Sequence, residues 1–257
     1  MRRKSRTRGK DYGVDLTQRG MSDLESLSAE LGVSQSTVRR DLDAMETYGL
    51  VRRTHGGVIW VGDRNNSTRP YAFDQRMAVQ IDAKRAIARA AAKLVKDGQT
   101  ILLDGGTTTF HLAEELLGRS VQIVTNSLPI ANRFINDERI ELILTGGLLY
   151  PRYGVLLGPQ AEEFISTVHA QTLFFSVAGV HDGALYNQNL LLVQAELSMM
   201  RQAQRRILLC DSSKFDSQAL ARLCELNAVN TIVTNAGITK QQRSMVKRAG
   251  CELLVAD

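Results

Sequence analysis

The sequence predicts the fold class α/β, with an N-terminal winged helix-turn-helix followed by an open parallel α/β domain. Residues 22–60 contain two helical patterns, a glycine turn between them and a short hairpin pattern. From residue 74 onward, short apolar runs alternate with amphipathic helical patterns, as in a parallel sheet that is buried on both faces. We therefore expect a basic tail over 1–10, a winged helix over 11–60, a linker over 61–73 and an α/β domain over 74–257.

The N-terminal tail accounts for the basic character of the chain. Residues 1–10 carry six basic and no acidic side chains, so the net charge of +5 becomes −1 without them. Such a tail can neutralise DNA phosphates without reading the base sequence. A merely solvated terminus or a misplaced translation start is the alternative.

Two helices are expected to precede the recognition helix. The first, over residues 12–20, is weakly indicated because Gly13 lowers helix propensity. For the second, Ser22 and Glu25 have the spacing of a capping box. Its buried stripe is formed by leucines at helical spacing, namely Leu24, Leu27 and Leu31.

The next segment is typical of the turn and recognition helix of a helix-turn-helix. Gly32 can supply the positive φ of the turn, and Ser34 is a good N-cap for a helix that begins at Gln35. Val38, Leu42 and Met45 form one apolar stripe. The residues expected to face the major groove lie at the start of this helix and off the stripe: Ser34, Gln35, Ser36, Thr37, Arg39 and Arg40.

A small hairpin follows this helix and would be the wing. Residues 50–60 contain two β-rich runs around Gly56-Gly57. Arg52, Arg53 and His55 would lie near phosphates of the double-stranded DNA operator. The competing interpretation of residues 31–42 is an ordinary amphipathic surface helix that carries two arginines.

The α/β domain is expected to alternate helices and strands. Helices are predicted over 83–94, 110–117, 129–136, 160–168 and 193–204, and strands over 100–104, 121–125, 140–145, 172–177, 206–210, 231–234 and 252–255.

The loops at the ends of these strands are rich in small and hydroxylated residues. In parallel sheets the carboxyl ends of the strands meet at one edge, where ligands bind. Glycine lets backbone N–H groups approach an anion, and a helix N-terminus adds its dipole. The expected ligand-binding residues are Asp104, Gly105, Gly106, Thr107, Thr108, Asn126, Gly146, Gly147, Gly179 and Lys214. They favour a small phosphorylated ligand, although glycines and threonines that only form tight turns are the alternative.

Other chemistry is disfavoured. No Lys follows the Asp104-Gly105-Gly106 loop as in a nucleotide-hydrolysing P-loop. Cys210, Cys224 and Cys251 lack metal-ligand spacing, so neither metal nor cofactor is expected. No secretory signal or membrane span is recognised, which favours a cytoplasmic protein without membrane partners. His111 is expected to be packed or solvated rather than to face the ligand.

The chain resembles the DeoR family of bacterial sugar-metabolism regulators from about residue 12 to its end. The matching segments are Ser36-Thr37-Val38-Arg39-Arg40-Asp41-Leu42, Arg53-Thr54-His55-Gly56-Gly57, Lys84, Asp104-Gly105-Gly106-Thr107-Thr108, Thr125-Asn126, Gly146-Gly147 and Asp211-Ser212-Ser213-Lys214-Phe215. The resemblance implies a C-terminal sensor domain with the fold of ribose-5-phosphate isomerase and glucosamine-6-phosphate deaminase. It departs where many members place a Glu near Leu192 and a Lys near Glu196.

The resemblance implies a transcriptional repressor of a carbohydrate operon that leaves DNA when it binds a phosphorylated sugar. A homo-oligomer, dimeric or tetrameric, is expected because one winged helix reads few bases. The alternative is a sugar-phosphate isomerase or deaminase with a DNA-binding module, for which Asp104 and Asp182 are the available acid/base candidates. We expect no enzymatic activity, and the sequence does not separate repression from activation.

Overall fold

The structure, a computed structural model, describes residues 21–47, 51–54, 57–60 and 73–257. The chain divides into two units, Met1–Arg69 and Pro70–Asp257. The basic tail and the first expected helix lie outside the described residues. The division falls within the segment 61–73 that the sequence assigns to a linker, and Phe73 already begins a helix of the second unit.

Unit 1 contains the helix-turn-helix. Helix α2 spans Leu24–Leu31 and α3 spans Gln35–Thr47, and Gly32 between them has a φ of 60°. The expected capping box is wrong. The N-cap of α2 is Asp23, whose carboxylate accepts the backbone N–H groups of Glu25 and Ser26 at 2.9 and 2.8 Å, and a carboxylate also suits the positive end of a helix.

Ser22 lies in a short strand that the sequence does not predict, at the edge of a sheet whose other two strands it does predict. Strand β2 (Val51–Thr54) pairs antiparallel with β3 (Gly57–Trp60), as expected of a wing. The short strand β1 (Met21–Ser22) adds to the other edge of β3. Buried side chains from both helices and the wing form the core of this unit, namely Leu27, Val38, Leu42 and Val58.

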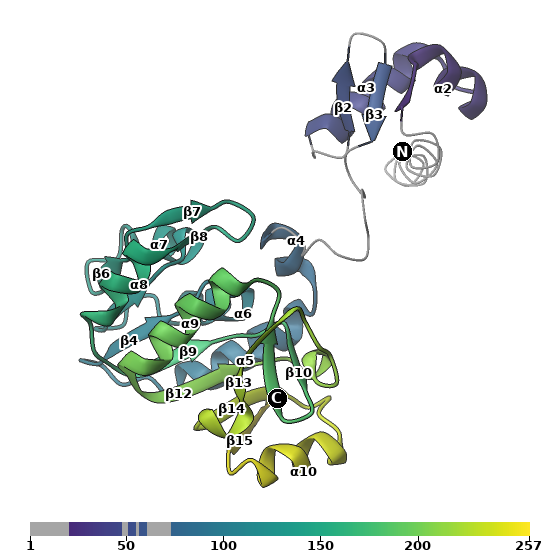
Figure 1. Ribbon diagram of the computed structural model, residues 1–257. Helices are drawn as coiled ribbons and strands as arrows, with labels where there is room; N and C mark the ends of the chain where they lie inside the picture. Colours follow the sequence, from purple (N-terminus) through teal and green to yellow (C-terminus); the bar gives the residue numbers. More distant parts are fainter. Residues whose placement is uncertain (1–20, 48–50, 55–56, 61–72) are drawn as a thin grey trace. The chain divides into compact units, whose positions relative to one another are not determined.

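Unit 2 is built on a seven-stranded parallel sheet, as predicted (Figure 1). Its strand order is β15-β14-β12-β9-β4-β5-β6, and every neighbouring pair is parallel. The strands are β4 (Thr100–Leu103), β5 (Gln122–Thr125), β6 (Glu141–Leu144), β9 (Ala170–Phe175), β12 (Ala203–Leu209), β14 (Thr231–Asn235) and β15 (Glu252–Ala256).

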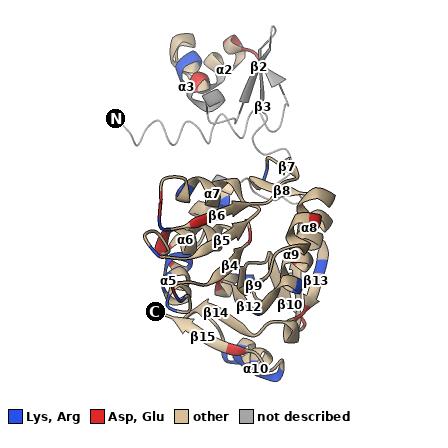
Figure 2. Ribbon diagram, turned by 90° about the vertical axis from the view of Figure 1, so that its left-hand side faces the viewer, with Lys and Arg blue, Asp and Glu red and all other residues tan. Residues whose placement is uncertain are grey.

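Helices cover both faces of this sheet, as Figure 2 shows. Helices α5 (Ile81–Ala92), α6 (Thr107–Glu115) and α7 (Leu128–Phe134) lie on one face. On the other lie α8 (Pro159–Ser166), α9 (Leu190–Gln202) and α10 (Lys240–Arg248). Along β4, Ile101 and Leu103 join the first layer while Leu102 joins the second. The alternation buries both faces, which explains why the strands are almost entirely apolar.

Several elements have no counterpart in the prediction. A short helix, α4 (Phe73–Ala78), precedes α5. Strands β7 (Leu148–Tyr150) and β8 (Val155–Leu157) form a hairpin, and β10 (Gly179–His181), β11 (Ala184–Asn187) and β13 (Ala221–Glu225) form a second, antiparallel sheet. Of these segments, α4, β8 and β11 contribute residues to the site described below.

Candidate functional site

The first candidate site is the exposed side of α3. Val38 and Leu42 are buried, which turns the opposite side of the helix to solvent. Of the residues expected to face DNA, Ser34, Gln35, Ser36, Arg39 and Arg40 are exposed and Thr37 is half-buried. Ser34 Oγ accepts the backbone N–H of Thr37 at 3.3 Å, as expected of an N-cap. Basic residues on α3 are visible in Figure 2.

The wing contributes less to the described site. Arg52 and Arg53 lie on β2, whereas His55 lies outside the described residues. The described part of unit 1 therefore presents the start of α3 as its candidate DNA-reading surface.

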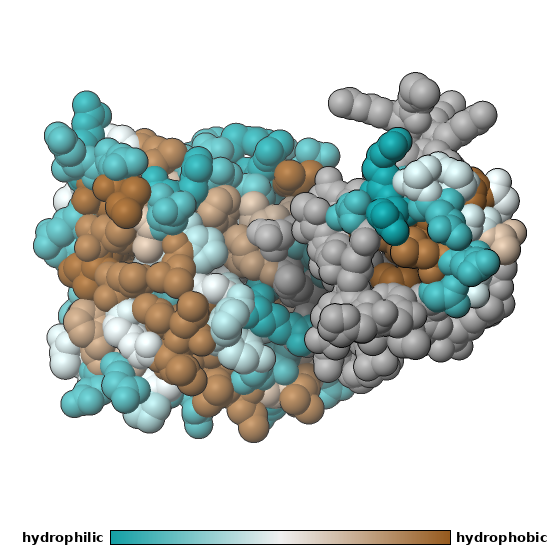
Figure 3. Space-filling model, turned by 90° about the horizontal axis from the view of Figure 1, so that it is seen from above, coloured by the Kyte–Doolittle hydropathy of each residue, from teal (hydrophilic) through white to brown (hydrophobic). Residues whose placement is uncertain are grey.

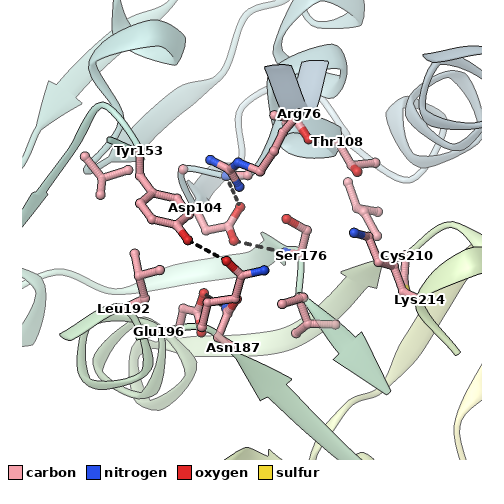
Figure 4. Close-up of a pocket in the computed structure, with 18 of the residues that line it drawn as sticks. Arg76, Asp104, Thr108, Tyr153, Ser176, Asn187, Leu192, Glu196, Cys210 and Lys214 are labelled. Carbon is pink, nitrogen blue, oxygen red and sulfur yellow. Dashed lines mark hydrogen bonds between the residues drawn. The ribbon is translucent and has the colours of Figure 1, made fainter. Parts of the chain in front are cut away.

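The second candidate site is a cavity of about 270 Å³ in unit 2 (Figure 4). It lies at the carboxyl ends of β12, β9, β4 and β5, four adjacent strands of the sheet. The chain runs outward from β4 in both directions, to β5 and β6 on one side and to β9 and β12 on the other. This reversal of strand order is the place where parallel α/β folds bind ligands.

Seven of the ten residues expected to bind ligand line this cavity: Asp104, Gly105, Gly106, Thr107, Thr108, Asn126 and Lys214. The other three do not line it. Gly147 has a φ of 122° and lies against Ala161, and a Cβ on Gly179 would lie 2.1 Å from the carbonyl oxygen of Ser217. Gly146 precedes the β7–β8 hairpin outside the cavity lining.

The glycines that do line the cavity are also required by their contacts within the protein. A Cβ on Gly105 would lie 2.0 Å from Cγ1 of Val155, and one on Gly106 would lie 1.9 Å from Oγ of Ser176. Their small size lets the loop after β4 fit between neighbouring elements.

One end of the cavity is cationic. Lys84 on α5 is only 4% exposed, and its ammonium donates a hydrogen bond to the backbone carbonyl of Arg76. Burial, with a further contribution from Lys214, lowers the pKa of Lys84 to about 8. The cavity also receives Thr107 and Thr108, the first residues of α6. Backbone N–H groups in the first turn of a helix have no partner within the helix.

Asp104 organises the centre of the cavity. Its Oδ1 accepts hydrogen bonds from the N–H of Gly106 at 3.0 Å and from the hydroxyl of Thr109 at 2.7 Å, and its Oδ2 accepts the N–H of Ser176 at 2.9 Å. Burial raises the pKa of Asp104 to about 6, although these hydrogen bonds act in the opposite direction. Asp104 thus joins the loop after β4 to the loop after β9.

A second buried carboxyl group, Glu196 on α9, lies at another part of the cavity wall. Its Oε1 accepts a hydrogen bond from the amide of Asn187 on β11. Burial, reinforced by the negative charge of Asp104, raises the pKa of Glu196 well above its usual value.

Arg76 brings the short helix α4 into the cavity wall. Its guanidinium lies 4.3 Å from the centre of the Tyr153 ring, a cation–π contact. Phe73 at the start of α4 packs edge-on against Phe110, with ring centroids 5.7 Å apart. Helix α4 is therefore attached to the site by Arg76, Tyr153 and Lys84.

Several polar atoms that line the cavity have no hydrogen-bond partner among the described residues. They are Nε and Nη2 of Arg76, Oδ1 of Asn126 and Oε2 of Glu196. Buried polar groups are normally hydrogen-bonded, so these atoms are available to a polar ligand.

Sequence reasoning missed Arg76 and Glu196. A signal existed for Glu196, which lies three residues before the buried Met199 and therefore on the same side of α9. His111 is buried outside the cavity lining, where its Nδ1 lies 2.9 Å from Glu114 Oε2.

Among the described residues, no group of three or more His, Cys, Asp or Glu is placed to hold a metal ion. Cys210, Cys224 and Cys251 are free thiols. No helix in the described ranges is long and apolar enough to cross a membrane.

Comparison with known proteins places both units in one family. The family described as the DeoR-like helix-turn-helix domain matches residues 15–63, and that described as the DeoR C terminal sensor domain matches residues 79–236. Among solved structures, ribose 5-phosphate isomerase A from Methanocaldococcus jannaschii is 22% identical and aligns over 52% of this chain and 54% of its own, with a TM-score of 0.39.

Curated relatives align over nearly their full length. The L-fucose operon activator of Escherichia coli (strain K12) is 32% identical, over 82% of this chain and 87% of its own. The transcriptional repressor CsqR of the same organism is 33% identical, over 86% of this chain and 84% of its own. The regulator UlaR of Shigella dysenteriae is 28% identical, over 93% of this chain and 94% of its own. The chain therefore belongs to the DeoR family of transcriptional regulators.

Proposed function

We propose that this regulator controls a carbohydrate operon as a repressor, and that it leaves its operator when a phosphorylated sugar occupies the cavity of unit 2. The observation that carries the proposal is the meeting of Lys84, Lys214 and the N-terminus of α6 in one cavity. Ammonium groups and unpaired backbone N–H groups are suited to a phosphate. Asn126 and Arg76 offer unpartnered polar atoms to the remainder of the ligand.

Helix α4 would carry the signal to the DNA-binding unit. It is the first described element of unit 2, and its Arg76 carbonyl accepts a hydrogen bond from Lys84. A phosphate that recruits the Lys84 ammonium competes with this carbonyl, so α4 loses one of its attachments. The ligand thereby favours one arrangement of α4 over another, as a change in DNA affinity requires.

The experiment is operator binding by the full chain. Fluorescence anisotropy would be measured on DNA from upstream of its own gene and its neighbours, at fixed salt, with a panel of sugar phosphates. We expect one compound to release the protein. Lys214→Met should weaken that response, whereas Lys93→Met, an exposed residue at the C-cap of α5, should not. Operator binding unaffected by every compound would contradict the sensor assignment.

We further propose that the chain acts as a homo-oligomer in the cytoplasm. Leu144, Leu148 and Leu149, at the end of β6 and on β7, are 38%, 70% and 43% exposed. Hydrophobic residues gather on the face of unit 2 seen in Figure 3, as at surfaces that contact another protein. Analytical ultracentrifugation should give a dimer or tetramer that Leu148→Glu weakens, and a monomeric parent protein would contradict this proposal.

Catalysis is not part of the proposal. Of the two candidate acid/base residues, Asp182 is not among the residues that line the cavity, and both oxygens of Asp104 accept hydrogen bonds from the protein. A coupled isomerase assay on the panel should give no turnover. Because relatives are named both activators and repressors, a reporter fused to the operator would settle the direction of regulation.

A further inference from the structure

The two adjacent arginines of α3 leave the helix in different directions. The side of α3 that packs into unit 1 is fixed by Val38 and Leu42, which are 0% and 1% exposed. Successive residues of an α-helix are turned by about 100°. Arg40 is two residues from each of these buried residues, so it lies about 160° from both. The packing of α3 therefore places Arg40 on the side of the helix opposite the core.

Arg39 lies on the flank of the same helix. By the same rotation it is about 100° from Val38 and about 60° from Leu42, although its side chain is exposed like that of Arg40. Ser36, one turn before Arg40, shares the outer side of α3, but its side chain is short. Its hydroxyl oxygen lies 2.9 Å from that of Ser34, the N-cap. Among residues 34–40, Arg40 is therefore the long side chain that stands opposite the core.

The major groove of DNA gives these two directions different partners. It is about 12 Å wide and about 8.5 Å deep, so an α-helix about 10–12 Å in diameter fills it. The side of the helix that is opposite its own domain then faces the base edges on the groove floor, while the flanks face the phosphates along the groove walls. Base contacts come from the first part of a recognition helix, and Arg40 lies in the first half of α3.

We propose that Arg40 sets the base specificity of this regulator by binding a guanine, and that Arg39 binds a phosphate of the operator backbone. A guanidinium donates two parallel hydrogen bonds to O6 and N7 of guanine, which is the commonest specific contact in the major groove. A phosphate contact carries no sequence information. The inference rests on the operator binding proposed above and is independent of the ligand of unit 2.

The test is selection of binding sequences by the full chain from a library of random double-stranded DNA at fixed salt. We expect the sequences enriched by the parent protein to share a guanine in each half-site. Arg40→Ala should lose this guanine. Arg39→Ala, the matched control at an exposed position of the same helix, should keep it and bind all sequences more weakly.

Lysine variants separate charge from geometry at the two positions. Lysine keeps the positive charge but lacks the planar pair of donors that matches a guanine edge. Arg39→Lys should therefore bind nearly as tightly as the parent protein, because a phosphate accepts either cation. Arg40→Lys should not recover the guanine preference. Where Arg40→Ala binds too weakly for selection, Arg40→Lys provides the same comparison.

The size of the effect is measured by anisotropy on two duplexes. One carries the enriched sequence, and in the other an A·T pair replaces the G·C pair at that position of one half-site. The parent protein should prefer the first by about 5- to 150-fold, the range that a bidentate contact to a base supplies. Arg40→Ala should bind both about equally. Arg39→Ala should keep the ratio of the parent protein and lose about one unit from the slope of log affinity against log salt concentration.

The outcomes separate this inference from operator binding itself. A guanine preference that survives Arg40→Ala and Arg40→Lys, or that is lost in Arg39→Ala instead, overturns the assignment of the two arginines while leaving operator binding in place. Absence of any enriched sequence for the parent protein overturns both. A changed base preference is measured on protein that is folded and bound to DNA, so unfolding of a variant does not mimic it.

Discussion

Lys84 is a buried lysine whose charge depends on pH within the range of ordinary experiments. Its pKa is lowered to about 8 by burial and by Lys214. In the free protein the ammonium is therefore lost as pH rises through about 8, and a phosphate must then bind an uncharged amine or restore the proton. We expect sugar-phosphate affinity to be constant near pH 7 and to fall between pH 7.5 and 9.5.

Two substitutions test the assignment of this titration. Lys84→Arg keeps a positive charge over the whole range, so affinity should no longer fall with pH. Lys84→Met should weaken sugar-phosphate binding at every pH and should also remove the dependence of that affinity on pH. Calorimetric titrations at four pH values provide the measurement, and an unchanged decline in both variants would assign it to another group.

Asp104 gives the corresponding prediction for stability. Its pKa is raised to about 6 from 3.8, so the folded protein holds the proton up to a higher pH than the unfolded chain does. The stabilising contribution is complete below pH 3.8 and is lost as pH rises through about 6, which amounts to roughly 3 kcal/mol for a shift of about two units. Asp104→Asn removes this dependence.

The measurement is urea unfolding of the full chain at pH 4.5 and 7.5, followed by circular dichroism. The variant loses an acceptor for Ser176 or for Gly106, so it should be less stable than the parent at pH 4.5. Its deficit should shrink by up to about 3 kcal/mol at pH 7.5. A deficit that is the same at both pH values would show that Asp104 keeps its ordinary pKa.

At the scale of elements, helix α3 carries the prediction for DNA. Arg39 and Arg40 lie on its exposed side, beside the buried Val38. Replacing either arginine by Ala should weaken operator binding by about 1–3 kcal/mol if it contacts a base edge or a closely held phosphate. Anisotropy on specific and random DNA distinguishes these cases, because loss of a phosphate contact weakens both. Undiminished binding by both variants would refute this use of α3.

The elements also show what the sequence could predict. The parallel strands were predictable because both faces of the sheet are buried, and with them the loops that hold Asp104 and Asn126 at one edge. Arg76 was not, because it reaches the cavity from a helix, α4, whose position depends on tertiary contacts. The spacing of Glu196 and Met199 indicated the buried side of α9 but not that Glu196 reaches the cavity. The β7–β8 hairpin was missed because Leu148 and Leu149 are exposed rather than alternating between core and solvent.

Phe73, at the start of α4, should control the response without itself taking part in binding of the ligand. Phe73 contacts Phe110 but does not line the cavity. Phe73→Ala removes this anchor and should reduce the effect of the sugar phosphate on operator affinity severalfold. The affinity of the protein for the sugar phosphate itself should change little. Titrations of ligand alone and of operator with saturating ligand give the two values. An unaltered operator response would mean that the signal leaves the cavity by another element.

For the whole molecule, the two sites must influence each other equally. If the sugar phosphate lowers operator affinity by some factor, operator DNA must lower the affinity for the sugar phosphate by the same factor. Typical coupling free energies of about 1–3 kcal/mol correspond to factors of about 5–150, which lie within reach of direct titration. We therefore expect the dissociation constant of the effector to rise by that factor when the protein is saturated with operator DNA.

Random DNA of the same length provides the control, because it lacks the operator sequence. It should change effector affinity less than the operator does at equal occupancy, since the DNA-competent arrangement is selected by the specific contacts of α3. In Phe73→Ala, the factor by which the effector lowers operator affinity and the factor by which the operator lowers effector affinity should both approach one. If the effector weakened operator binding while saturating operator left effector affinity unchanged, the release would come from competition outside the cavity, and the coupling through α4 would be wrong.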